Sequence, residues 1–93
     1  MKKVFILSSF ERSIKRFTSQ DKEKLEKSLE AFNSFLSKGE APLGFRFKKI
    51  NHDKYEFRID IHLRVIVKVE DDNFYLVLAG NHDDVKRYLR NYR

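Results

Sequence analysis

The segment YEFRIDIHLRVIVKVEDDNFYLVLA (residues 55–79) contains the pattern that decides the fold. In Tyr55–Ile59 and again in Leu63–Val69, apolar residues alternate with mostly charged ones, which is typical of strands with one buried face. The run Phe74–Ala79 is apolar throughout and predicts a central strand. Because only short turns separate the three segments, they predict an antiparallel meander.

The residues before this meander predict one strand and two helices. Val4–Leu7 is a short apolar run, typical of a buried strand. A helical period then appears twice, and Thr18 with Asp21 forms a capping-box pattern at the start of the second helix. Gly39 and Pro42 are suited to end that helix. The apolar stripes are Phe10, Ile14 and Phe17 in the first helix, and Leu25, Leu29, Phe32 and Leu36 in the second.

A third helix is predicted after Gly80, with Asn81 or Asp83 as its cap and an apolar stripe at Val85, Tyr88, Leu89 and Tyr92. The predicted order is therefore β-α-α-β-β-β-α in a single domain, residues 1–93. We expect an α+β fold, with a twisted, mainly antiparallel sheet, a two-helix hairpin packed on one face and a C-terminal helix.

Composition excludes several classes of protein. The chain of 93 residues has no cysteine, which excludes disulfide scaffolds, zinc ribbons, Fe–S clusters and thiol catalysis. Its apolar runs are too short to span a membrane. With 20 Lys and Arg against 14 Asp and Glu, the net charge is +6. This excess indicates an anionic partner, such as nucleic acid, an acidic protein or an anionic membrane surface.

The positive charge is concentrated on the predicted sheet. Between Arg46 and Val69 there are seven basic residues and three acidic ones, and residues 85–93 add four basic residues and no acid. Strand alternation places Arg58, Arg64 and Lys68 on one sheet face, with the helices on the other. This pattern predicts a cation-lined surface that binds phosphates, although a solvated face that keeps the protein soluble would give the same pattern.

Three histidines, His52, His62 and His82, are candidates for proton transfer near pH 7. His82 is the strongest of them, because it follows the strand-ending Gly80 and precedes a helix start. No pair of histidines has the spacing of metal ligands, so no metal site is predicted.

At the level of motifs, the chain resembles the RelE/ParE superfamily of toxins from type II toxin–antitoxin systems. The resemblance covers essentially the whole length and depends on the order of elements and on short motifs. These motifs are Lys48-Lys49-Ile50, Tyr55-Glu56-Phe57-Arg58-Ile59, Leu63-Arg64-Val65-Ile66-Val67, and Leu78-Ala79-Gly80-Asn81-His82-Asp83-Asp84-Val85.

The resemblance implies a cytoplasmic toxin that is neutralised by a small antitoxin with an acidic segment. RelE- and YoeB-like members are metal-independent endoribonucleases that cut mRNA in the ribosomal A site, whereas ParE-like members poison DNA gyrase. By resemblance, Arg64 stabilises the scissile phosphate, Arg58 is a further basic site residue, and His82 is the general acid or an electrostatic stabiliser. Lys48 and Lys49 match a basic pair that contacts the RNA backbone, and no cofactor is implied.

The residues themselves extend this set. Glu56 lies on the polar side of its strand and is a candidate proton acceptor, with Lys48, Lys49 and His62 as alternatives. Further RNA contacts are predicted for Arg46, Lys68, Lys86 and Arg90.

The chain also departs from the family pattern in two places. Asp83 and Lys86 stand where many members have tyrosine, and Phe45 and Arg46 stand where YoeB-type members have a catalytic glutamate. A gyrase inhibitor, or a non-catalytic RNA-binding or interaction domain on the same fold, therefore stays open as an alternative.

Overall fold

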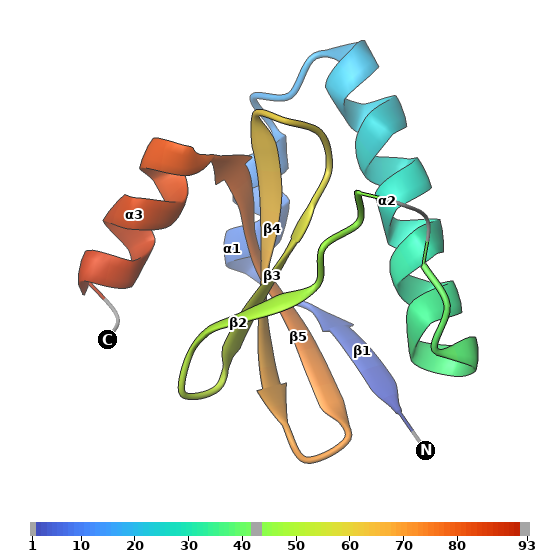
Figure 1. Ribbon diagram of the computed structural model, residues 1–93. Helices are drawn as coiled ribbons and strands as arrows, with labels where there is room; N and C mark the ends of the chain where they lie inside the picture. The colour runs from blue at the N-terminus through green and yellow to red at the C-terminus, as the bar shows by residue number, and fades with distance from the viewer. Residues whose placement is uncertain (1, 42–43, 92–93) are drawn as a thin grey trace.

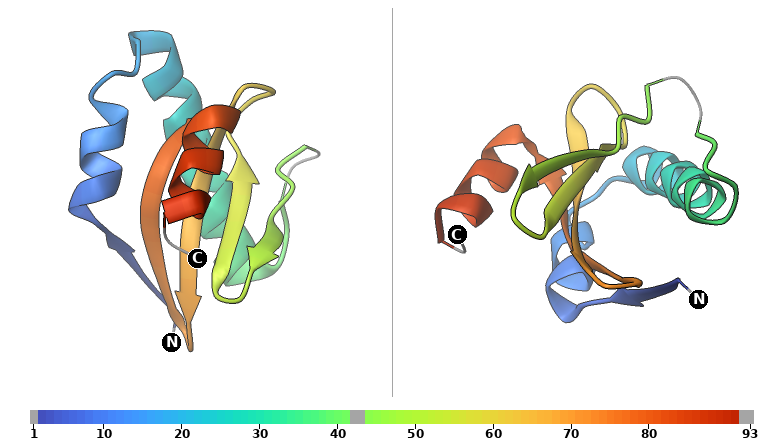
Figure 2. Two further views of the ribbon diagram at one scale, coloured as in Figure 1. Left: turned by 90° about the vertical axis from the view of Figure 1, so that its left-hand side faces the viewer. Right: turned by 60° about the horizontal axis from the view of Figure 1, so that its bottom comes forward.

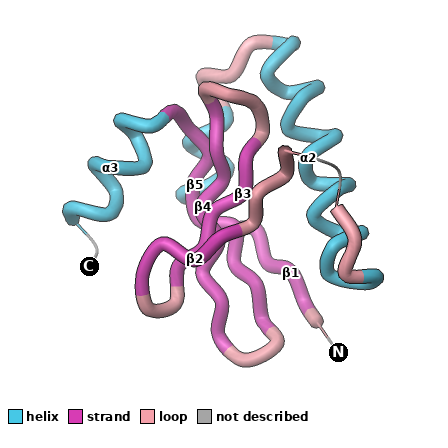
Figure 3. Tube along the Cα trace, viewed as in Figure 1, coloured by secondary structure: helices cyan, strands magenta, loops and turns pink. Residues whose placement is uncertain are grey.

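The structure is a computed structural model that describes residues 2–41 and 44–91 (Figures 1 and 3). Within these residues, three helices accompany one five-stranded sheet with the strand order β1-β5-β4-β3-β2. β1 runs parallel to β5, and the other neighbouring strands are antiparallel. This arrangement confirms the predicted α+β class and the mainly antiparallel sheet. The elements are β1 (Lys3–Ile6), α1 (Ser8–Ile14), α2 (Ser19–Lys38), β2 (Lys48–Asn51), β3 (Lys54–Arg58), β4 (Leu63–Glu70), β5 (Asn73–Asn81) and α3 (His82–Asn91).

Strand β2 is an addition to the predicted order of elements. Lys48 lies opposite Glu56 and Lys49 opposite Tyr55, and the register shifts before Asn51. Two adjacent lysines interrupt the apolar alternation that identified the other strands. Lysine is common on edge strands because its charge discourages pairing with another chain. The strand therefore gave only a weak signal in the sequence.

Both predicted ends of α2 are confirmed. The Asp21 N–H donates to Thr18 Oγ1 at 3.1 Å, and the Thr18 N–H donates to Asp21 Oδ2 at 3.4 Å, which completes the capping box. Gly39 follows the last turn with a φ of 74°, a left-handed conformation that glycine adopts without a Cβ clash. Pro42 and Tyr92, which the sequence analysis assigned to the ends of the second and third helices, lie outside the described residues.

Helices α1 and α2 pack on one face of the sheet, where an aromatic core forms (Figure 2). Phe32 of α2 is 1 % exposed and stacks on Phe57 of β3, with ring centroids 4.9 Å apart. Its ring also makes a T-shaped contact with the ring of Phe74 of β5, with centroids 6.0 Å apart. The aromatic core is built around Phe10, Leu25, Phe32, Phe45, Phe57, Val65, Val67, Phe74, Leu76 and Ala79.

The outer edge of β5 is shared between a strand and a helix. β1 pairs with residues 73–76 of β5, and α1 runs beside the next residues. Ser9 Oγ donates to the Val77 carbonyl at 2.6 Å, and the Ala79 N–H donates to Ser13 Oγ at 3.0 Å. Serine side chains of α1 therefore satisfy backbone groups that a longer β1 would have paired.

Helix α3 lies on the opposite face of the sheet from α1 and α2. Its Val85 packs on Ile66 of β4 and Val77 of β5 in a second, smaller apolar cluster. The Asp84 N–H donates to Asn81 Oδ1 at 2.9 Å, and the Asn81 N–H donates to Asp84 Oδ2 at 3.0 Å. Of the two predicted caps, Asn81 is therefore the one that the structure uses.

A register shift explains why the run Phe74–Ala79 is apolar without alternation. Ile66 pairs with Leu78 but Val67 pairs with Leu76, so Val77 is an extra residue in β5. Val77 and Leu78 consequently both belong to the cluster beneath α3. No helix among residues 2–41 and 44–91 is long and apolar enough to cross a membrane.

Candidate functional site on the open sheet face

Strand register places Arg58, Arg64 and Glu56 on the face of the sheet that carries α3. Arg58 lies directly opposite Arg64, and Glu56 lies opposite Ile66, which packs beneath α3. Since side chains alternate along a strand, Glu56 and Arg58 share this face of β3, and Arg64 and Ile66 share it on β4. The prediction that Arg58 and Arg64 occupy one face is confirmed.

An ion pair fixes the centre of this group. Arg64 Nη1 donates to Glu56 Oε2 at 2.7 Å, and Lys48 Nζ lies 3.9 Å from the same oxygen. The Glu56 and Arg64 side chains are 8 % and 19 % exposed, so the pair is largely removed from solvent. Arg64 Nε is buried and has no hydrogen-bond partner among the described residues. The Glu56 carboxylate therefore holds the Arg64 guanidinium by its Nη1 atom.

The charges in this group do not cancel. Three cations share this face with the one carboxylate of Glu56, which leaves a net charge of +2: Lys48 and Arg64 are its ion-pair partners, and Arg58 lies opposite Arg64. We call these four residues the basic cluster. Guanidinium groups match pairs of phosphate oxygens, and a partly desolvated cation attracts an anion more strongly than an exposed one. The basic cluster can thus hold a phosphate and stabilise negative charge that develops on it.

Helix α3 adds a second row of basic side chains. His82, Lys86 and Arg90 are four residues apart, so they share one stripe of the helix, and all three are exposed. Tyr88 lines a hollow toward α1, on the other flank of the helix. At 100° per residue, the flank with His82 and Lys86 faces along the sheet toward β4 and β3. Leu63 and Arg64 pair with Asn81 and Gly80, so His82 begins the helix beside this part of β4.

Three predicted RNA-contacting residues lie apart from the basic cluster. Lys49 is opposite Tyr55, whose ring stacks on Phe47 on the α2 side, so the pleat sends Lys48 and Lys49 to different faces. They do not form a pair on one surface. Lys68 shares the face of Arg64 but lies four residues further along β4, about 13 Å away, beside Glu70 at 3.5 Å. Arg46 is exposed before β2 with a φ of 51°.

The other two histidines occupy exposed turns. His52 lies in the β2–β3 turn and His62 in the loop between β3 and β4. In that loop the His62 and Leu63 N–H groups donate to Asp60 Oδ1 at 2.8 and 2.7 Å. Among residues 2–41 and 44–91, no group of three or more His, Asp or Glu side chains is arranged to hold a metal ion.

Two basic residues near α3 were not singled out from the sequence. Arg12 of α1 and Arg16, in the turn that follows α1, line a hollow of about 570 Å³, together with Leu78 and Tyr88. Arg16 Nη2 also lies 4.0 Å from Asp84 Oδ1 at the start of α3. Because Arg16 lies beyond the end of α1, a helical period does not connect these two arginines, and only the fold brings both beside α3.

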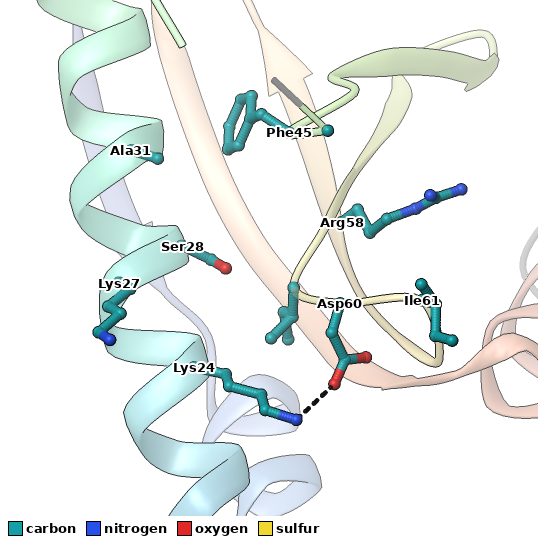
Figure 4. Close-up of a pocket in the computed structure, with 10 residues that line it drawn as sticks. Lys24, Lys27, Ser28, Ala31, Phe45, Arg58, Asp60 and Ile61 are labelled. Carbon is teal, nitrogen blue, oxygen red and sulfur yellow. Dashed lines mark hydrogen bonds and ion pairs between the residues drawn. The ribbon is translucent and has the colours of Figure 1, made fainter. Parts of the chain in front are cut away.

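A separate cavity of about 420 Å³ lies between α2 and the β3–β4 loop (Figure 4). Lys24 Nζ donates to Asp60 Oδ2 at 3.1 Å across its opening, whereas Arg58 extends away from α2. Burial works to raise the pKa of Asp60. The His62 and Leu63 N–H groups and the Lys24 ammonium outweigh it, and the net shift of this pKa is downward. Asp60 thus anchors the loop that carries Arg64 into β4.

Replacing Asp60 by asparagine should destabilise the protein in a pH-dependent way. The folded-state pKa of Asp60 is below its ordinary value of 3.8, so its charge stabilises the fold above that pH, and this contribution is lost as pH falls through the folded pKa. We expect a loss of about 1–2 kcal/mol at pH 7 that shrinks below pH 4. Urea unfolding at pH 7 and at a pH below 4 measures the change in the free energy of unfolding. Glu26→Gln on the exposed face of α2 is the control, and a pH-independent loss would contradict the assignment.

Comparisons with known proteins find similarity in fold but not in sequence family. No model of a known protein family matches the sequence, and no curated protein does.

Several solved structures do match the fold. The YafQ toxin in the DinJ–YafQ complex from E. coli is 13 % identical, with a TM-score of 0.68 over 91 % of this chain and 98 % of that chain. The RelB–RelE antitoxin–toxin complex from Methanococcus jannaschii matches at 14 % identity and a TM-score of 0.68, over 90 % and 96 %. The YoeB dimer from Staphylococcus aureus is 19 % identical, with a TM-score of 0.64 over 87 % of this chain and 97 % of that chain. The chain therefore has the RelE-like fold, as the motif resemblance predicted.

Proposed function

We propose that this chain is the toxin of a type II toxin–antitoxin system, a metal-independent endoribonuclease that cuts mRNA in the ribosomal A site and so inhibits translation. The observation that carries the proposal is the basic cluster on the open sheet face, with Arg64 held by Glu56 beside the exposed flank of α3. The fold shared with YafQ, RelE and YoeB, and the motif resemblance to ribonuclease members of their family, support it.

The proposed reaction uses the 2′-hydroxyl of the RNA as nucleophile on the adjacent phosphate. The bond from phosphorus to the 5′-oxygen breaks, which leaves a 2′,3′-cyclic phosphate and a 5′-hydroxyl. Arg64, with Arg58 opposite, stabilises the charge on the non-bridging oxygens, a contribution of about 3 kcal/mol for a preorganised donor. His82 donates a proton to the leaving 5′-oxygen, which is worth on the order of 10²–10⁴-fold.

Glu56 enters this proposal as a positioning residue. Both of its ion-pair contacts, with Arg64 and Lys48, are made through Oε2, and its side chain is only 8 % exposed. A carboxylate engaged in this way fixes the guanidinium in place, and it is a poor acceptor for a substrate proton. Lys48 is an ammonium cation in the basic cluster and has no lone pair for a proton, so His62, exposed in the adjoining loop, is the more accessible acceptor.

The remaining predicted cations serve as a binding surface in the proposal. Lys86 and Arg90 extend the stripe of His82 on α3, and Arg46, Lys49 and Lys68 lie further out on the sheet. Contacts of this kind with the phosphate backbone are independent of base sequence and weaken steeply with salt. They would hold mRNA on the ribosome without selecting a codon.

The proposed partner is a cognate antitoxin with an acidic segment. The matching YafQ and RelE structures are complexes with the antitoxins DinJ and RelB. A net charge of +6 favours an acidic partner, and neutralisation would follow if that partner covered the basic cluster. A toxin that acts on ribosomes works in the cytoplasm and, in this reaction, needs no cofactor.

The test is a translation reaction programmed with a defined mRNA, to which the purified protein is added. We expect cuts within the A-site codon by primer extension, undiminished by EDTA and absent when ribosomes are omitted. Translation that continues with uncut mRNA would contradict the proposal. Loss of gyrase supercoiling would indicate the ParE-like alternative, and salt-sensitive RNA binding without cleavage would indicate a non-catalytic domain.

The variant Glu56→Gln tests the positioning role. Glutamine keeps a carbonyl oxygen for the Arg64 contact but loses the charge, so we expect about a tenfold or smaller loss in cleavage rate and an unchanged pH profile. A loss of 10²-fold or more, together with disappearance of the acid limb of the pH–rate profile, would make Glu56 the general base instead.

A further inference from the structure

The cavity between α2 and the β3–β4 loop has the size and lining of a small-molecule site (Figure 4). Its volume of about 420 Å³ falls within the range of roughly 300–1,000 Å³ that is common for ligand pockets. Ala31 of α2 and Ile59 of the loop provide apolar walls, and the ring of Phe45 points back toward α2. Arg58 borders the cavity, but its side chain extends away from α2, so the proposed cleavage makes no use of this space.

A buried hydroxyl group without a partner points into this cavity. Three polar residues are buried in the described part of the chain, Ser13, Ser28 and Glu56. Ser13 Oγ makes two hydrogen bonds, at 2.6 and 3.0 Å, and Glu56 accepts one from Arg64. Ser28 is 8 % exposed, yet its hydroxyl has no hydrogen-bond partner among the described residues, and it is directed from α2 into the cavity (Figure 4). Because a buried hydroxyl is unfavourable without a hydrogen bond, Ser28 indicates a place for a polar group of a ligand.

The mouth of the cavity carries an excess of positive charge. Lys24 and Lys27 of α2 and Asp60 of the loop border it, so two cations and one anion leave a charge of +1. Lys24 Nζ reaches Asp60 across the opening, but the Lys24 side chain is 51 % exposed, and ion pairs at the surface contribute little to stability. A carboxylate that enters from solvent can therefore replace Asp60 as the partner of Lys24.

The distance between the two polar groups sets the length of the ligand. Lys24 and Ser28 are four residues apart on α2, which is one helical turn and about 6 Å along the axis. A benzene ring with a polar substituent at each end has a similar length. We propose that the cavity binds a small aromatic carboxylate with a hydroxyl group at the far end of its ring. The carboxylate binds Lys24, the hydroxyl bonds to Ser28, and the ring packs against Phe45.

Hydrogen bonds join the walls of the cavity to the strands that carry the basic cluster. The Arg58 N–H donates to the Phe45 carbonyl at 2.9 Å, and Asp60 Oδ1 accepts from two N–H groups of the chain just before Arg64. A ligand that takes Lys24 from Asp60 removes one of the contacts that hold this loop. The occupied cavity would thus slow cleavage of mRNA without a contact to the basic cluster. This effect rests on the proposed function, whereas binding itself does not.

The probe is para-hydroxyphenylacetate, added to the full chain and followed by amide NMR spectra. We expect saturable shifts at Ser28, Phe45 and Asp60. Phenylacetate, which lacks the hydroxyl, and tyramine, which has an ammonium group in place of the carboxylate, should each bind about tenfold more weakly. Shifts confined to other residues, equal binding of the three compounds, or no binding of para-hydroxyphenylacetate would overturn the proposal.

A matched pair of serine variants tests the hydroxyl contact. Ser28→Ala should weaken binding of para-hydroxyphenylacetate about tenfold and leave binding of phenylacetate unchanged, because only the first compound has a group for Ser28 to bond. Ser34→Ala, on the exposed face of α2, is the control and should alter neither affinity. An equal loss for the two compounds in Ser28→Ala would contradict the contact, because it would reflect a change in the fold instead.

A matched pair of lysine variants tests the carboxylate contact and its effect on the loop. Lys24→Gln should weaken binding of para-hydroxyphenylacetate about tenfold, whereas Lys22→Gln, at an exposed site on the same helix, should not. Saturating probe should slow cleavage by the unmodified chain several-fold and leave the rate of Lys24→Gln unchanged. Equal slowing of both proteins, or of neither, would contradict the effect on the loop. Binding by a preparation that cuts no mRNA would support the site while contradicting the proposed function.

Discussion

Replacing Arg64 by alanine should reduce mRNA cleavage by about 10²–10³-fold, because a preorganised cation that stabilises transition-state charge contributes on this scale. The variant loses the guanidinium of the basic cluster and also leaves the Glu56 carboxylate with Lys48, at 3.9 Å, as its remaining ion-pair partner. The measurement is the rate at which A-site cuts appear in single-round translation reactions. In cells, induction of the variant should no longer arrest growth.

Two further variants separate catalysis from loss of fold. Arg64→Lys keeps a charge beside Glu56 but lacks the planar fork, so we expect a folded protein whose cleavage is still strongly reduced. Lys68→Ala removes one positive charge from the same face and strand, about 13 Å from Arg64, and should lower the rate only a few-fold, with the effect shrinking as salt rises. Cleavage by folded Arg64→Ala within tenfold of the original rate would refute the assignment.

Replacing Phe32 by alanine should destabilise the protein by about 3–5 kcal/mol. Its ring is 1 % exposed and contacts Phe57 and Phe74, so it joins α2 to β3 and β5. Domains of this size are stable by about 5–15 kcal/mol, so this one change removes a large part of the total. Thermal unfolding measures it, and we expect Tm to fall by roughly 12 °C or more.

The alanine variant can fail to accumulate in folded form, so Phe32→Leu provides a second measurement. Leucine fills part of the space that the Phe32 ring occupies, and we expect it to lower the free energy of unfolding by less than half as much as alanine does. Ile61→Ala, at a side chain that is 73 % exposed, is the surface control and should stay within about 0.5 kcal/mol of the original protein. A Phe32→Leu protein as stable as the control variant would show that α2 is held by other contacts.

The parts of the fold that were predictable from the sequence are those with a strong local signal. The Thr18–Asp21 box and Gly39 fix the ends of α2 through contacts within a few residues. The alternation in β3 and β4 fixed which side chains share a face, and so brought Arg58 and Arg64 together. These features depend on backbone geometry that repeats every two or 3.6 residues, which a single sequence displays directly.

The remaining features depend on contacts between distant parts of the chain. The extra residue Val77 in β5 is visible only against the register of β4, and the separation of Lys48 from Lys49 only once β2 is known to be a strand. The ion pair between Glu56 and Arg64 is likewise a cross-strand contact. Alternation shows that both residues are on one face, but it does not show that the Glu56 carboxylate is engaged in an ion pair.

The parallel pairing of β1 with β5 also constrains how the protein is made. Lys3 pairs with Asn73, 70 residues later, so the first strand of the sheet has no partner until most of the chain has left the ribosome. At 5–20 residues per second, the interval is roughly 4–14 s. During this time Val4, Phe5 and Ile6 belong to an incomplete nascent chain, and α3 is not yet in place beside Arg64. The proposed toxin would therefore acquire its active surface only at the end of its own synthesis, and other chains can engage its N-terminal strand before then.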